Sequence, residues 1–209
     1  MNNLLILPIL IPLLTGIILV ILRHNVPLQR GLSVLATFST AGVSIHLIQT
    51  ISDYGIQTLE LGGWEAPYGI VLVADMFSGL LVLTTSVVTI GCLLFAIRSI
   101  GIEREKFYFY PFLQFLITGV NGSFLTGDIF NLFVCFEVML ISSYVLITLG
   151  ATRVQLRESI KYVLVNTLSS TMFLLGIAYL YSITGTLNMA HLSARIAQAG
   201  QGGILTTVA

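Results

Sequence analysis

Long apolar segments are the feature of this sequence that most restricts its fold. A soluble domain carries about 25% charged residues, whereas only 9% of this chain is charged and 56% is hydrophobic. A bilayer core about 30 Å thick needs about 20 apolar residues per helix. Six segments of suitable length can be drawn, at residues 4–22, 28–51, 70–97, 107–125, 129–149 and 160–183. The sequence therefore predicts an all-α polytopic bundle of about six full transmembrane helices, with the start of a seventh at Gly203.

The distribution of charge predicts the orientation of these helices. The first segment is expected to be a retained helix, because Met1-Asn2-Asn3 leads into it without a basic region. Eight of the nine Lys and Arg residues fall in the connections after the first, third and fifth segments. By the positive-inside rule these connections are cytoplasmic and the N-terminus lies outside. The acidic loop residues Asp53, Glu60, Glu65 and Asp128 fall on the outer side.

The outer connections contain two further signals. Thr126-Gly127-Asp128 joins the fourth and fifth segments. We expect Gly127 to end one helix and Asp128 to cap the next, so that the two helices are antiparallel neighbours. The Gly-rich stretch from Gly185 to Gly203 is more polar, and it predicts an outer loop with a short interfacial helix at residues 191–199.

Several functional classes lack support in the sequence. The net charge is zero, which gives no electrostatic argument for nucleic-acid binding. Cys92 and Cys135 lie in apolar segments and indicate small core residues rather than a disulfide or zinc site. His24, His46 and His191 are scattered and form no plausible ligand set. Neither a phosphate loop nor a dinucleotide fingerprint is present, so we expect no cofactor and no resident metal.

Glu137 is the strongest candidate for chemistry. Its neighbours one helical turn away, Phe133, Val134, Leu140 and Ile141, are all apolar. A charge at the centre of a transmembrane helix costs on the order of 2.5–3.5 kcal/mol on insertion scales. Such a residue is expected to face the bundle interior and to act as a proton relay, the alternative being a static ion pair between helices.

Other polar residues recur at helical spacing and could line a hydrated path beside Glu137. Equally, they could be interhelical hydrogen-bonding groups, worth about 0.6 kcal/mol each. The spacing does not distinguish proton transfer from sodium coordination. Asp75 is expected near a helix start, where the helix dipole favours it, and Lys161 is expected to mark the cytoplasmic interface. The path candidates are Gln114, Thr118, Asn121, Asn131, Asn166, Ser169 and Ser170, with Tyr162 on the same face as the last three.

Two stretches carry a resemblance to a known family. Residues 126–137, Thr-Gly-Asp-Ile-Phe-Asn-Leu-Phe-Val-Cys-Phe-Glu, resemble the hallmark of the antiporter-like subunit family. Residues 161–170, Lys-Tyr-Val-Leu-Val-Asn-Thr-Leu-Ser-Ser, resemble the sixth-helix motif of that family. Its members include large subunits of Mrp-type cation/proton antiporters and proton-pumping membrane-arm subunits of respiratory complex I and related hydrogenases.

The resemblance implies an architecture and a function. Family members have about fourteen helices around inverted repeats of about five helices each. Residues 1–209 would then be one transmembrane domain, with peripheral helices in 1–106 and the start of the first repeat in 107–209. Glu137 would be one half of a Glu–Lys pair whose lysine, on the seventh helix, is not among these residues.

The implied function is that of a secondary active transporter subunit rather than an enzyme. It would exchange Na+ for H+ alongside other hydrophobic subunits in the plasma membrane of a bacterium. One alternative is a proton-pumping membrane-arm subunit of a complex I-like or hydrogenase-like oxidoreductase. Another is an assembly subunit without a transport role.

Overall fold

The computed structural model describes residues 3–203, with side chains through residue 197. Two strands interrupt an otherwise helical chain. The elements run η1 (Asn3–Ile6), α1 (Leu7–Ile21), α2 (Val26–Tyr54), β1 (Gln57–Glu60), η2 (Leu61–Gly63), β2 (Val71–Ala74), α3 (Met76–Ser99), α4 (Ile102–Glu105), α5 (Phe109–Leu125), α6 (Ile129–Thr148), α7 (Arg153–Thr184) and α8 (Met189–Gly203).

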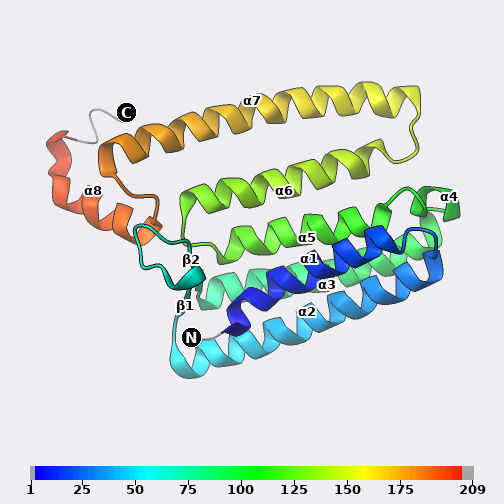
Figure 1. The fold of residues 1–209 in the computed structure, drawn as a ribbon, viewed down its shortest axis with the longest axis horizontal. Coiled ribbons are helices and arrows are strands. Elements are labelled where there is room, and N and C mark those ends of the chain that lie inside the picture. The colour runs from blue at the N-terminus through cyan, green and yellow to red at the C-terminus, as the bar shows by residue number, and fades with distance from the viewer. Residues whose placement is uncertain (1–2, 204–209) are drawn as a thin grey trace.

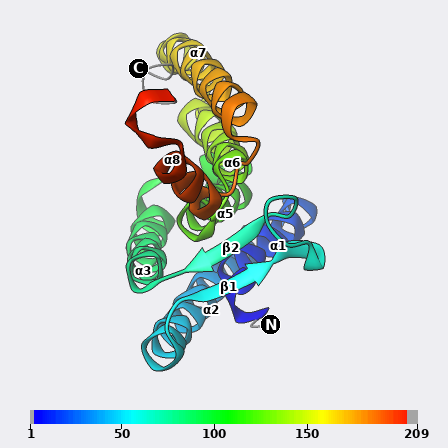
Figure 2. The ribbon, with the colours of Figure 1, turned by 90° about the vertical axis from the view of Figure 1, so that its left-hand side faces the viewer.

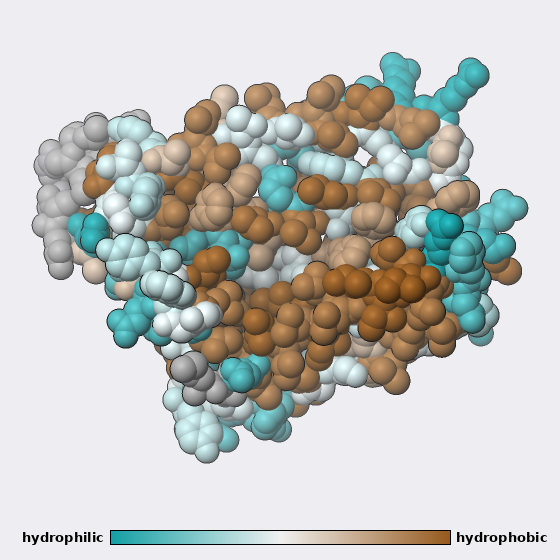
Figure 3. All heavy atoms as spheres, viewed as in Figure 1, coloured by the Kyte–Doolittle hydropathy of each residue, from teal (hydrophilic) through white to brown (hydrophobic). Residues whose placement is uncertain are grey.

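The long helices run alongside one another, and α5 occupies the centre of the arrangement (Figure 1). It packs against α1 and α3 on one side and against α6 on the other. Helix α7 packs against α6, so that α6 and α7 extend outward from the bundle of α1, α2, α3 and α5 (Figure 2). Apolar residues cover most of the helix length on the face drawn in Figure 3, and hydrophilic residues are concentrated at the two ends.

Five stretches among the described residues have the length and apolar composition needed to cross a membrane. The sixth expected helix is α5, which has 17 residues and lies alongside the others. The bundle is therefore all-α and polytopic, as expected. The count of six spans and the outside location of the N-terminus stay predictions. The five stretches are Asn3–Ile21, Val26–Tyr54, Met76–Ser99, Ile129–Thr148 and Arg153–Thr184.

A short antiparallel hairpin joins three connections at one end of the bundle. Strands β1 and β2 pair from Gln57 with Ala74 to Glu60 with Val71. The Gly127 amide donates to the Val71 carbonyl at 2.8 Å, and the Met189 amide donates to the Gly127 carbonyl at 2.9 Å. This end therefore holds the α2–α3, α5–α6 and α7–α8 connections together.

The role expected for Gly127 was wrong in its detail. Helix α5 ends at Leu125, and Thr126 is its extended C-cap. Gly127 is not in the left-handed region. Instead, a Cβ at this position would lie 2.7 Å from Cγ2 of Val73. The glycine is needed because the hairpin approaches the α5–α6 turn closely.

The structure also corrects several expected helix bounds. The third segment was expected to be helical from residue 70, but Val71–Ala74 is β2 and α3 begins at Met76. Asp75 caps α3, because its side chain accepts from the Ser78 amide at 2.8 Å. The sixth segment was expected from residue 160, but α7 begins at Arg153.

The remaining bounds concern the fourth segment and the C-terminal part. Helix α5 begins at Phe109 rather than at residue 107, because Tyr108 has φ 64° in the left-handed region. The expected helix at residues 191–199 lies within α8. Apart from Gly203, at the end of α8, the expected seventh segment lies outside the described residues.

Candidate functional site

Helix α6 begins at a well-defined cap and carries Glu137 near its middle. The Asp128 carboxylate accepts a hydrogen bond from the Asn131 amide at 2.9 Å, which confirms the expected cap. The Asn131 side chain donates to the Thr126 hydroxyl at 2.9 Å. Asn131 therefore belongs to the start of the helix, whereas Glu137 is the ninth of its 20 residues.

Two glycines of α5 determine which face of α6 turns toward the central bundle. A Cβ at Gly119 would lie 2.7 Å from the Cys135 carbonyl oxygen and 2.7 Å from the Met139 amide nitrogen. At Gly122 it would lie 2.6 Å from the sulfur of Cys135. Because each helical residue advances by about 100°, Glu137 lies about 200° around α6 from Cys135. Glu137 therefore faces away from α5.

The opposite face of α6 meets α7. Phe133 and Phe136 each place their rings 6.3 Å from that of Phe173. Nearer the α6–α7 connection, the rings of Tyr144 and Tyr162 meet edge to face at 5.6 Å. Tyr144 follows Glu137 by seven residues, which places both on one face of α6.

Glu137 is partly buried, and one oxygen atom of its carboxylate lacks a hydrogen-bond partner among the described residues. Its Oε1 atom is buried and has no hydrogen bond among the described residues. The ion pairs found within residues 3–197 do not include it. Among the described residues, the carboxyl group therefore has no ion-pair partner and an incomplete set of hydrogen bonds.

The polar residues predicted to accompany Glu137 divide into two groups. On α5, Gln114 donates to the Ser33 carbonyl of α2 at 3.3 Å, and Asn121 donates to the Pro8 carbonyl of α1 at 2.8 Å. The Thr118 hydroxyl donates within its own helix to the Gln114 carbonyl. The two amides of this group therefore reach toward α1 and α2 rather than toward α6.

The α7 group faces α6, the helix that carries Glu137. Asn166, Ser169 and Ser170 line a hollow of about 250 Å³ between α6 and α7, together with Phe133, Phe136, Met139, Leu140 and Phe173. Glu137 itself is not among the lining residues. A path that includes the α7 residues and Glu137 stays a prediction.

Glu105 is a buried acidic residue that the sequence did not single out. It is fully buried and accepts hydrogen bonds from Nε and Nη2 of Arg30 at 3.1 and 2.8 Å. The two residues are 75 positions apart, so no local spacing pattern reveals the pair. The only available signal was an acidic residue between Arg104 and Lys106 in a predominantly basic connection.

No group of three or more His, Cys, Asp or Glu residues within the described part of the chain could hold a metal ion. Glu137 is instead the one carboxylate of α6, on a helix pair that also contains Tyr144 and Tyr162.

Comparisons with known proteins find relatives that align with the whole chain. A family model described as "NADH:quinone oxidoreductase/Mrp antiporter, TM" matches residues 126–208. The chain is 54% identical over 209 residues to the D-type subunit of a Na(+)/H(+) antiporter from Alkalihalophilus pseudofirmus. It is 52% identical over 208 residues to the protein of the same name from Bacillus subtilis. All of the chain is covered, but it spans only 42% of the length of either relative.

Two solved structures share the fold. One is an archaeal respiratory membrane complex, the membrane-bound sulfane sulfur reductase, with TM-score 0.85 and 31% identity over 91% of this chain and 39% of that chain. The other is the Mrp complex from a Dietzia species, with TM-score 0.82 and 29% identity over 94% of this chain and 40% of that chain. The bacterial relatives and the membrane-spanning helices identify a multi-pass bacterial membrane protein. Residues 126–208 match the NADH:quinone oxidoreductase/Mrp antiporter family, and the whole chain is similar to the corresponding part of D-type subunits of Na+/H+ antiporters.

Proposed function

We propose that this chain is part of a subunit of a multisubunit monovalent cation (Na+)/proton antiporter, in which Glu137 takes up and releases the transported proton within the membrane. The observation that carries the proposal is the buried Oε1 atom of Glu137, which has no partner among the described residues. An intramembrane carboxylate is costly and is by default a functional candidate. The names of the relatives support sodium and protons as the ions exchanged.

The proposed partners are other hydrophobic membrane subunits, and the proposed location is the bacterial plasma membrane. The exposed apolar faces of α6 and α7 support such a setting, because they must meet lipid or another protein surface. Residues 1–106 would be peripheral helices, and residues 107–209 would begin the first repeat. On this proposal the protein is a secondary active transporter subunit, without enzymatic activity of its own.

Replacing Glu137 with Gln in the full-length subunit tests the proposal, since Gln keeps the shape and loses the titratable group. Inverted membrane vesicles containing the assembled complex would be energised, and the collapse of the pH gradient on addition of Na+ would be followed by fluorescence. We expect Glu137→Gln to abolish exchange while the complex still assembles.

Asp128→Asn provides a matched control on the same helix. It also removes one carboxylate, but Asn retains the capping interaction at the start of α6. We expect this variant to exchange Na+ for H+ as the unmodified complex does. Normal exchange by an assembled Glu137→Gln complex would exclude the proposed role of Glu137.

A second candidate function is that of a proton-pumping subunit in a membrane arm, where redox chemistry in other subunits drives the pumping. The likeness to an archaeal respiratory complex favours it. Both functions use the same helices, so the partners distinguish them. Purification with small hydrophobic subunits would support the antiporter, whereas purification with iron–sulfur or flavin subunits would support the redox complex.

A further inference from the structure

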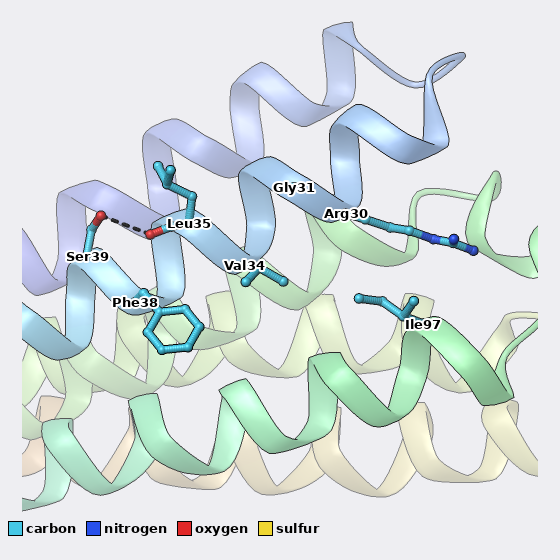
Figure 4. Close-up of a pocket in the computed structure, with 7 residues that line it drawn as sticks. All are labelled: Arg30, Gly31, Val34, Leu35, Phe38, Ser39 and Ile97. Atoms are coloured by element: carbon cyan, nitrogen blue, oxygen red, sulfur yellow. Dashed lines mark hydrogen bonds between the residues drawn. The ribbon is translucent and has the colours of Figure 1, made fainter.

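A groove on the side of the bundle remote from Glu137 has no part in the proposed exchange. It has a volume of about 780 Å³ and is lined by residues of α2 between Arg30 and Ser39 and by Ile97 of α3. Figure 4 shows the lining side chains, with Arg30 at one end and Phe38 and Ser39 at the other. The Ser39 hydroxyl donates to the Leu35 carbonyl at 2.9 Å. We call this feature the α2–α3 groove.

Gly31 contributes no side chain to the lining of the α2–α3 groove. A Cβ built at Gly31 meets no atom within 4 Å. The large apolar residues around it also remain exposed, with Leu35 at 65% and Phe38 at 55%. An apolar ligand could therefore enter from the side, where the hydrocarbon core of a bilayer surrounds the helices.

The length of the groove matches one leaflet of a bilayer. Arg30 lies in the second turn of α2, which begins at Val26. From Arg30 to Ser39 the helix rises nine residues, or about 13.5 Å at 1.5 Å per residue. Half of a hydrocarbon core is about 15 Å. An acyl chain lying in the groove would extend from the headgroup level at Arg30 to about the middle of the bilayer.

The charge at the open end suits a phosphate group. Glu105 is buried and holds the Arg30 guanidinium through Nε and Nη2, while 30% of the Arg30 side chain remains exposed. Basic residues also predominate at this end of the bundle. They are Arg98 in the last turn of α3 and Arg23 and Lys106 in the connections, against the exposed Glu103, whereas Arg104 of α4 lies against Gly150. Such clusters attract anionic headgroups, and a guanidinium bonds strongly to phosphate.

We propose that the α2–α3 groove binds a bilayer phospholipid, with an anionic headgroup at Arg30 and one acyl chain passing Gly31 and Leu35 to reach Phe38. The lipid would cover the exposed apolar side chains of α2, such as Leu35 and Phe38, beside Ile97 of α3. This site is independent of Glu137 and of the proposed exchange.

Photochemical labelling of the full-length complex tests the site. The complex would be reconstituted in membranes that contain phosphatidylglycerol with a photoreactive group midway along one acyl chain, and labelled peptides would be mapped by mass spectrometry. We expect labels between residues 31 and 39 and beside Ile97. A Cβ at Gly31 meets no atom within 4 Å, so we expect Gly31→Leu to fill part of the groove and to remove most of this labelling.

Gly42→Leu is the matched control, because Gly42 lies on the same helix and its Cβ also meets no atom within 4 Å. This variant should label between residues 31 and 39 as strongly as the unmodified protein. Equal labelling of the Gly31→Leu and Gly42→Leu complexes would overturn the proposal. Labels that map to another protein chain instead of to residues 31–39 would also overturn the proposal.

Competition with unlabelled lipid tests the headgroup without disturbing the Arg30–Glu105 pair. One basic residue near an anionic surface is expected to favour phosphatidylglycerol over phosphatidylcholine by about fivefold. Equal competition by the two lipids would overturn the assignment of an anionic headgroup.

Discussion

Two regions of the bundle bury very different shares of their apolar stretches. The first region consists of α1, α2, α3 and α5, and the second region consists of α6 and α7. The shares are 28%, 33% and 28% for the stretches containing α1, α2 and α3, but 6% for each of α6 and α7. In the first region, polar side chains reach between helices, as Gln114 does toward α2 and Asn121 toward α1. In the second, the buried Oε1 of Glu137 finds no protein partner within the described residues.

The Asn121 contact shows how the first region uses a polar residue. In a regular helix the Pro8 carbonyl would accept a hydrogen bond from residue 12, but Pro12 has no amide hydrogen. Asn121 donates to this carbonyl at 2.8 Å from the neighbouring helix α5. The contrast indicates that buried polar groups join helices in the first region, whereas the carboxylate of α6 joins no helix pair among the described residues.

Removing Glu105 should have the largest effect on stability. Glu105→Ala leaves the partly exposed Arg30 guanidinium without its bidentate partner and removes a fully buried, charge-assisted set of hydrogen bonds. We expect the thermal midpoint of the assembled full-length complex to fall by several degrees. Glu103→Ala, an exposed change on the same short helix α4, should leave the midpoint unchanged. Equal midpoints for both variants would show that the pair does not stabilise the first region.

Glycine substitutions compare the packing of the two regions directly. Gly119→Ala would force apart the backbones of α5 and α6, at a cost of about 1–3 kcal/mol. At Gly176 on α7 a Cβ meets no atom within 4 Å, so Gly176→Ala should gain about 0.5–1 kcal/mol in helix stability. Denaturant titration of the two variant complexes measures both effects. A loss of stability in Gly176→Ala would show that this face of α7 is tightly packed in the complex.

The cap of α3 should make a smaller contribution. Asp75→Ala is expected to cost about 1 kcal/mol, while Asp75→Asn retains most of the capping interaction. The hydrogen bond from the Ser78 amide, aided by the Ser78 side chain, lowers the pKa of Asp75. Because the folded-state pKa is below the ordinary value of about 3.9, the stabilisation is complete above that pH. It is lost as the pH falls through the folded-state pKa.

Thermal midpoints measured at decreasing pH check this prediction. The difference between the unmodified protein and Asp75→Asn should shrink below about pH 4, since only the aspartate loses its charge there. A difference that does not change with pH would show that the Asp75 charge does not contribute to the cap.

Glu137→Gln should have the smallest effect on stability, in contrast to its expected effect on exchange. The carboxylate forms no ion pair among the described residues, so we expect the thermal midpoint of the complex to be nearly unchanged. A fall as large as that of Glu105→Ala would contradict the comparison, because it would show that Glu137 stabilises the assembled protein through a partner outside these residues.

The helices of both regions were largely predictable from the sequence, because apolar length and isolated charges are local properties. The third segment contains a stretch whose secondary structure these local properties do not predict. Val71–Ala74 is as apolar as a helix requires, yet it is a strand because it pairs with Gln57–Glu60. The same approach of distant segments explains Gly127, where the hairpin leaves no room for a side chain.

Hydropathy and charge along the chain were enough to predict a bundle of membrane helices with one carboxylate, Glu137, in the middle of an apolar helix. They could not predict that Gln114 and Asn121 reach toward α1 and α2 rather than toward α6, or that Glu105 lies buried against Arg30. Hydropathy along a chain records the cost of placing each residue in a bilayer. The partner of a polar group depends on which helix faces meet, and those faces are set by close contacts such as that of Gly119 with Cys135 and Met139.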